Sequence, residues 1–414
     1  MRRSKGPFRG KSFVIAVRRA PHQRMPLVSP RLPDGVSQAQ YSAKLARRVM
    51  RHCTAWGLAY SALLVSCGLD GDFPGPTYET EHLRILTSFE DPLCRGDLLE
   101  LEGFIDSVQT TLGIEMSEPV DVYLRDEFSD TRKLECGGRG ACYRASMHSV
   151  FTTPSVIHHE LTHAITASAG FPSAFLIEGI AMAMDKNVVL FGGVELTSQL
   201  SLTTKKVSYI AAGHFTRWLL DTYGAAKWRE LYSHGSGKTR HFERVYGKKF
   251  ASLQEEYFES APWIYPPLYH YEVPWMEENT LGWRENFVFD CSSSDTFGRI
   301  GIIVVLRTLE ISTPGMYDVW TSADGVSLSR DIDRPIDTIE EAERAAYGDA
   351  PISSSLTPIG GIAYVPGGTL RTLELDAGIY TVYVGDIDRD AEQALVTILP
   401  HRGGLNHIPE PEGP

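Results

Sequence analysis

His159, Glu160 and His163 stand in the run HELTH, whose residue types and spacing suit a metal-activated hydrolytic site. On a helix, residues four apart project from the same face, so the two histidines can bind one ion together. Glu160 follows the first histidine and is placed to accept a proton from a zinc-bound water. The alternative is an ordinary surface or core helix that carries two histidines.

The flanking sequence predicts that this run lies on a helix with a defined start and end. Thr153 offers an N-cap and Pro154 a proline at the first helical position, and apolar residues then recur at helical spacing. Gly170, followed by Phe171 and Pro172, closes the helix. The motif is therefore expected on an element that can present both histidines on one face.

A catalytic zinc ion needs a third protein ligand and one open position for water. No Asp, Glu, His or Cys lies between His163 and Glu178, so Glu178 is the first residue able to complete the set. It falls in a second apolar helical stretch, FLIEGIAMAMD, where a lone carboxylate is costly to bury without a partner such as a metal ion. Two other interpretations are a glutamate on the polar side of this helix, and Asp185 as the ligand or as a group bonded to a ligand histidine.

The run HELTH followed by IEGIA, within residues 159–185, resembles the gluzincin zinc metallopeptidases, in which HExxH is joined by a glutamate on the next helix. The short gap before the glutamate is more similar to bacterial families called peptidase-MA-like, which carry HELxH and EGxA motifs. The resemblance implies Zn²⁺ as cofactor, His159, His163 and Glu178 as its ligands and Glu160 as general base. The metzincin pattern is excluded, because it requires Gly and His where this chain has Thr and Ala.

Residues around the motif complete the comparison. The stretch 209–232 resembles the helix that follows the glutamate helix in these families, which implies that Tyr209 bonds the oxyanion, with His214 behind it. Tyr209 can equally be a packed core aromatic. Met182 departs from the thermolysin-like pattern, which has an aspartate there to orient a ligand histidine. His158 projects about 100° away from its neighbour and is not expected to be a ligand.

The predicted fold class is α+β, with a gluzincin-like domain over residues 79–260, built from a small mixed sheet plus helices. Strands are expected at 81–89, 120–126 and 141–151, with an amphipathic helix at 96–113, and 153–260 is expected to be mostly helical. In gluzincins a strand placed like 141–151 forms the edge along which an extended peptide pairs. A linker rich in proline and aromatic residues, 261–283, leads to an antiparallel β-sandwich over 284–400.

The ends of the chain indicate export. The chain has 414 residues and a net charge of −12, but residues 1–51 carry thirteen Lys or Arg and one acid, which leaves −24 for the rest. Residues 1–49 are interpreted as a disordered basic extension or a mis-assigned start, and 50–67 as a lipoprotein signal peptide ending in a lipobox-like LVSC. Cys67 would then be lipidated, with 68–78 as a tether and 401–414 as a tail. A buried helix with an incidental cysteine is the alternative for 53–67.

Export permits disulfides between the four cysteines that follow Cys67. Cys136 and Cys142 close a small glycine-rich loop and are the favoured pair, while Cys94–Cys291 follows only by default. Three connectivities remain open. A structural zinc site is less favoured because no CxxC pair exists.

The sequence therefore predicts an exported, membrane-anchored zinc metallopeptidase that acts on a peptide or protein substrate. Its expected location is the bacterial cell envelope, facing the periplasm or the exterior. An acidic body argues against nucleic acid as a partner. The alternative function is a non-catalytic envelope or surface binding lipoprotein that keeps a metallopeptidase fold. Substrate preference and oligomeric state are not predicted.

Overall fold

The computed structural model describes residues 75–401, apart from 76, 127–135, 137–139, 188, 192, 205, 235–236, 300, 339–361 and 388–390. The expected basic extension and signal peptide, most of the tether and all of the tail except His401 lie outside the described residues. Residues Gly68–Pro414 belong to one compact unit. Among the helices described, none is both long enough and apolar enough to cross a membrane.

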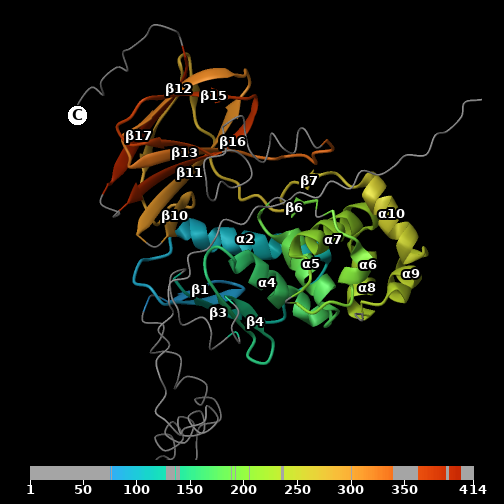
Figure 1. Ribbon diagram of the computed structural model, residues 1–414. Helices are drawn as coiled ribbons and strands as arrows, with labels where there is room; N and C mark the ends of the chain where they lie inside the picture. Colours follow the sequence, from blue (N-terminus) through green and yellow to red (C-terminus); the bar gives the residue numbers. More distant parts are fainter. Residues whose placement is uncertain are drawn as a thin grey trace, which may run out of the picture. The chain divides into compact units, whose positions relative to one another are not determined.

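The chain is of the mixed α+β class, and its first part is built on a five-stranded sheet (Figure 1). The strands are β1 (Thr77–Glu79), β2 (Leu83–Thr87), β3 (Val120–Leu124), β4 (Cys142–Arg144) and β5 (Ser149–Thr152), in the order β1-β2-β3-β5-β4. The three central strands are parallel, and β1 and β4 run antiparallel at the two edges. Parallel neighbours need a crossover connection, which α2 (Arg95–Leu112) supplies between β2 and β3.

The prediction of one strand over 141–151 is wrong. The segment forms a hairpin in which Tyr143 of β4 lies opposite Val150 of β5. The turn at 145–148 ends in His148, whose φ of 48° is left-handed and reverses the chain. An apolar pattern does not reveal such a turn. The short strand β4 therefore forms one edge of the sheet, with β1 at the other.

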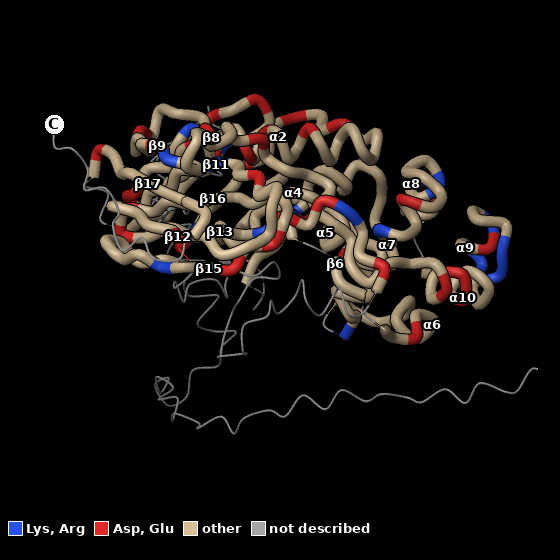
Figure 2. The backbone as a smooth tube through the Cα atoms, turned by 90° about the horizontal axis from the view of Figure 1, so that it is seen from above, with Lys and Arg blue, Asp and Glu red and all other residues tan. Residues whose placement is uncertain are grey.

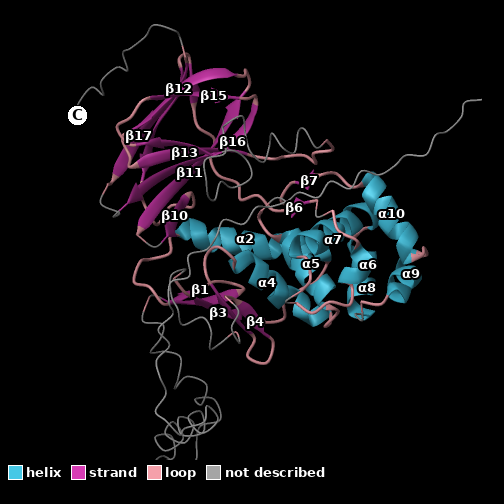
Figure 3. Ribbon diagram, in the orientation of Figure 1, coloured by secondary structure: helices cyan, strands magenta, loops and turns pink. Residues whose placement is uncertain are grey.

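Seven helices follow β5 within the described chain, and Figure 3 shows them gathered together. They are α4 (Ile157–Thr166), α5 (Ala174–Met184), α6 (Leu196–Gln199), α7 (Tyr209–Tyr223), α8 (Ala225–His234), α9 (Thr239–Tyr246) and α10 (Phe250–Ser260), with the 3₁₀ turn η2 (Ala167–Ala169) continuing α4. Strands β6 (Val189–Leu190) and β7 (Ile264–Tyr265) pair to form a two-stranded antiparallel sheet. Their apolar faces and the sheet share one hydrophobic core.

The HELTH helix starts later than expected. Residues Thr153–Val156 form a turn that is closed by a 3.2 Å bond from the Val156 N–H to the Thr153 carbonyl, and α4 begins at Ile157. Pro154 is consequently part of the turn and not the first helical residue. The expected end is confirmed, because η2 stops at Ala169 and Gly170 has a φ of 135°.

Two glycines allow α5 and α7 to approach closely. A Cβ on Gly179 would lie 2.4 Å from Thr216 Oγ1 and 2.8 Å from the Ala212 carbonyl oxygen, and a Cβ on Gly213 would lie 2.5 Å from Met182 Cβ. Gly179 directly follows Glu178, so this contact fixes where the carboxylate is placed.

Substituting Gly179 by Ala is expected to lower the free energy of unfolding by about 1–3 kcal/mol through overpacking, although Ala has the higher helix propensity. Urea unfolding measures the effect. Gly315→Ala is the matched control, because a Cβ there meets nothing within 4 Å. Equal stability of both variants would show that the helices tolerate a wider separation.

The second part of the chain consists of two antiparallel five-stranded sheets (Figure 3). One has the order β10-β11-β16-β13-β14 and the other β15-β12-β17-β9-β8. The strands are β8 (Glu278–Asn279), β9 (Gly282–Val288), β10 (Thr296–Arg299), β11 (Ile302–Ile311), β12 (Gly315–Thr321), β13 (Gly325–Arg330), β14 (Ile362–Pro366), β15 (Arg371–Leu375), β16 (Gly378–Ile387) and β17 (Gln393–Pro400). Alternate residues of both sheets, such as Val319 and Val382, enter a second core that the sheets share, which is a sandwich arrangement.

A covalent and hydrogen-bonded junction connects the first helix to the sandwich. Cys94, the N-cap of α2, forms a disulfide with Cys291, and the Arg95 N–H donates to the Cys291 carbonyl at 2.8 Å. The Asp97 carboxylate accepts a bond of 2.7 Å from the Gly298 N–H. The second disulfide joins Cys136 to Cys142. The favoured pair Cys136–Cys142 is therefore confirmed, and the pair that followed only by default, Cys94–Cys291, is present as well.

The segment expected as a linker packs against the first part of the chain. Tyr269 donates a 3.1 Å bond to the Glu100 carbonyl and meets the Phe104 ring edge-on at 5.9 Å.

Charged side chains are spread over the described elements, with acidic positions marked along α2 and α10 and basic positions near α9 (Figure 2).

Candidate metal centre

His159, His163 and Glu178 converge on one point. The Nε2 atom of His159 lies 3.2 Å from His163 Nε2 and 3.2 Å from Glu178 Oε2, and His163 Nε2 lies 3.4 Å from the same carboxylate oxygen. The histidines come from successive turns of α4 and the glutamate from the first half of α5. Within the described parts of the chain, this is the one group of His, Cys, Asp or Glu side chains found to be able to hold a metal ion.

The triangle fits a tetrahedral ion. Ligand atoms about 2.0–2.2 Å from a tetrahedral zinc ion lie about 3.3–3.6 Å from one another, close to the separations observed here. Two imidazoles and one carboxylate also form a known catalytic donor set that leaves one position open. Glu178 is 5% exposed among apolar neighbours, so an ion would compensate its buried charge. The residues present therefore suit a bound divalent metal.

Glu160 is held at the β4 edge of the sheet. Its buried carboxylate accepts a hydrogen bond from the backbone N–H of Tyr143, which belongs to β4. An edge strand carries backbone groups that its single neighbour does not use, and one of these is directed at Glu160. The side chain expected to act as base thus lies between the triad and the strand edge.

The protonation of these groups follows from burial and their mutual contacts. Burial raises the pKa of Glu160 and outweighs the nearby histidines, which lower it. Burial alone would raise the pKa of Glu178 too, but bonds from His159 and His163 reverse the effect and lower it to about 2. Glu178 is therefore kept ionised, the state that a metal ligand requires.

The other predicted site residues differ in how they lie relative to the triad. The Tyr209 ring stacks on the His159 ring, with centroids 6.0 Å apart, so Tyr209 does lie beside the triad. Asp185 is not a member of the triad, although its charge is among the causes that raise the pKa of His159 against the opposing effect of burial. Met182 packs under Gly213 of α7. Its position supplies no carboxylate, and the buried Nδ1 of His163 has no hydrogen-bond partner among the described residues.

His214 lies away from the triad, in the aromatic core. It is fully buried, and its Nδ1 lies 2.9 Å from the Tyr257 hydroxyl. Burial lowers the pKa of His214 to about 3. His214, which was expected behind Tyr209, is therefore a neutral imidazole with a structural role.

A neutral buried histidine makes stability depend on pH. Between about pH 6.5 and pH 3 the unfolded chain binds a proton that the folded chain does not, so acid destabilises the fold. As the pH is lowered, the free energy of unfolding should fall more steeply in the wild type than in His214→Gln. The expected difference in slope is about 1.4 kcal/mol per pH unit. Urea unfolding at pH 6 and pH 4 measures the difference. His234→Gln, at an exposed site, should keep the wild-type slope; an unchanged slope in His214→Gln would contradict the assignment.

Two contacts around the site had no clear sequence signal. His158 Nε2 lies 2.7 Å from Glu100 Oε1, which ties α4 to α2, and His158 is not among the three converging side chains. Tyr232 of α8 donates a 3.3 Å bond to Thr166 Oγ1. Burial raises the pKa of Tyr232 to about 12, and the charge of Glu178 contributes to this shift. The partners lie far apart in the chain and follow no common spacing, which is why the motif alone did not reveal them.

Comparisons with known proteins leave the family open. No protein-family model matches the chain, and no curated protein matches it. Among solved structures, the crystal structure of FeII HppE has 9% sequence identity and a TM-score of 0.12, and its match covers 49% of this chain and 87% of that one. A match of this kind establishes neither a shared fold nor a shared function.

Proposed function

We propose that this protein is a gluzincin-type zinc metallopeptidase of the peptidase-MA-like kind. The observation that carries the proposal is the triad of His159, His163 and Glu178 with Glu160 held between it and the edge of β4. A purely structural metal site has no need of a buried carboxylate beside the ligands. The proposal includes export and anchoring in a bacterial envelope through lipidated Cys67, which rests on the sequence alone.

The outer edge of β4 would bind the substrate. An extended peptide that adds to an edge strand gains backbone hydrogen bonds with little sequence preference. The Tyr143 N–H, directed at Glu160, identifies the point on this edge that is nearest to the base. A peptide paired there would carry one of its carbonyl groups past the triad.

The residues of the chain then have distinct tasks. Zinc, when bound, supplies Lewis-acid chemistry that acidifies water and polarises a carbonyl group. Glu160 accepts the proton of the attacking water and passes it to the leaving amine nitrogen. Tyr209 donates a hydrogen bond to the carbonyl oxygen as that oxygen gains negative charge. The burial that raises the pKa of Glu160 suits a group that takes up and releases a proton.

Metal analysis combined with a peptide-library assay tests the proposal. Purified protein is expected to hold one equivalent of zinc and to cleave peptides, with activity lost on chelation and restored by Zn²⁺. Mass spectrometry of the library identifies the bonds cleaved. One equivalent of zinc without cleavage of any peptide would instead favour the alternative of a binding lipoprotein.

A further inference from the structure

A pocket of about 230 Å³ lies between β4 and the C-terminal end of α4. Most of its wall is carbon, contributed by Met116, Tyr143, Ala164, Ile165 and Phe171. Sites for whole small molecules usually occupy about 300–1,000 Å³. The volume is therefore suited to one large side chain.

The pocket adjoins the proposed catalytic site through Tyr143, although neither Glu160 nor the triad lines it. Tyr143 lines it, and the backbone N–H of the same residue donates to Glu160. Ala164 is four residues after Glu160 and therefore on the same face of the helix, one turn further on. A peptide bound along β4 and past the base can thus direct one of its side chains into the pocket.

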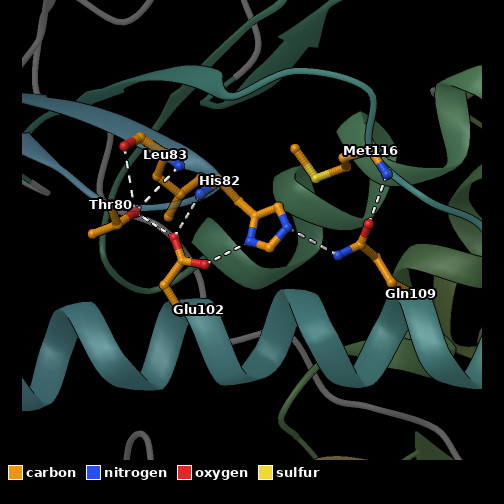
Figure 4. Close-up of polar contacts among 6 residues, drawn as sticks. All are labelled: Thr80, His82, Leu83, Glu102, Gln109 and Met116. Atoms are coloured by element: carbon orange, nitrogen blue, oxygen red, sulfur yellow. Dashed lines mark hydrogen bonds and ion pairs between the residues drawn. The ribbon is translucent and has the colours of Figure 1, made fainter.

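The part of the pocket wall that contains Met116 is connected to α2 by a series of hydrogen bonds (Figure 4). Glu102 and Gln109 of α2 flank the His82 ring, at 2.6 Å from Nδ1 and 3.3 Å from Nε2. The Gln109 side-chain oxygen accepts a bond of 2.6 Å from the Met116 N–H. His82 therefore has a structural role, and the bond to Gln109 holds the backbone of Met116 beside the pocket.

The polar groups of the wall are occupied or solvated. The two ring nitrogens of His148 lie 3.2 Å from the Tyr143 hydroxyl and 3.2 Å from the Glu118 carbonyl oxygen. The Glu118 side chain is exposed. Phe171, by contrast, leaves 76% of its surface open at this site, which an apolar group would cover.

We propose that this pocket is a specificity site that takes one large apolar side chain, of the leucine or phenylalanine class, from the peptide substrate. The inference rests on the proposed function. It identifies the substrates as peptides with a bulky apolar residue near the scissile bond. Burial of such a side chain corresponds to an affinity gain of about 10- to 100-fold over alanine.

Binding, measured separately from cleavage, tests the pocket. Fluorescein-labelled heptapeptides of alanine, each with Leu, Phe or Arg at one position, are titrated with zinc-loaded Glu160→Gln protein, and anisotropy reports binding. One position is expected to favour Leu or Phe over Ala about 10- to 100-fold. Adding Ala167→Leu, which fills the pocket, should reduce the preference below about threefold. Ala251→Leu, at an exposed site on α10, should leave it intact.

Unfolding curves and zinc content of the Ala167→Leu protein show whether it is folded. If it is not, Phe171→Ser removes an exposed wall residue and should weaken the same preference several-fold. A preference that survives both substitutions, or no preference, overturns the inference. So does a preference for Arg that Glu118→Gln abolishes. An apolar preference in a protein that cleaves no peptide would keep the pocket and refute the proposed function.

Discussion

Glu160→Gln protein is expected to cleave peptides about 10²–10⁴-fold more slowly than the wild type, as kcat/KM, while it keeps its zinc. Glutamine has nearly the shape of glutamate, and its side-chain oxygen can still accept the bond from the Tyr143 N–H. What it lacks is the ability to take up the proton of water. The substitution therefore separates proton transfer from folding and from metal binding.

The measurement compares initial rates on the best peptide from the library, together with zinc content and the unfolding midpoint. Glu255→Gln is the matched control, since this glutamate is exposed on α10 and should keep the full rate. A wild-type rate in Glu160→Gln would remove Glu160 from its role. Loss of zinc along with activity would assign the residue to the metal and not to proton transfer.

Glu178→Ala protein is expected to lose the stabilisation that zinc confers. A metal ion present at 100 times its Kd raises the free energy of unfolding by about 2.7 kcal/mol, because it binds only the folded chain. With two imidazoles left, the site has too few ligands to hold zinc at the same concentration. The unfolding midpoint of the wild type should therefore rise with added Zn²⁺, and that of the variant should stay constant.

Two further substitutions make this result specific. Glu255→Ala should respond to zinc as the wild type does. Asp185→Ala should also retain one equivalent of zinc, because the structure places Asp185 outside the triad. If Asp185→Ala loses the ion and Glu178→Ala keeps it, the assignment of the third ligand is reversed.

The triad that could hold a metal ion was predictable because its information is local. His159 and His163 share a helix face by spacing alone, and Glu178 is the first residue able to complete the set. The structure brings the three together as expected. The Tyr143 N–H could not be predicted in the same way, because it is a backbone group whose direction depends on the pairing of β4 with β5.

The fold was predictable where the side-chain pattern was strong. The helix expected at 96–113 agrees with α2, and the expected antiparallel character of the second part is found. Strands β9 and β13 carry no clear sequence signal of their own, because polar residues such as Arg284 and Ser327 interrupt their apolar pattern. Pairing with β17 holds β9, and pairing with β16 holds β13. Both pairs join residues that are distant in the sequence. The start of α4 was misplaced because a turn with a proline resembles a helix N-terminus.

The disulfide between Cys94 and Cys291 has a consequence for the integrity of the chain. Its half-cystines are 197 residues apart, and all three triad residues and Glu160 lie between them. The segment that carries the site is thus a closed covalent ring. A single break in the backbone within this ring would leave both fragments attached. The cleaved molecule would therefore migrate as one species in denaturing electrophoresis until a reductant is added.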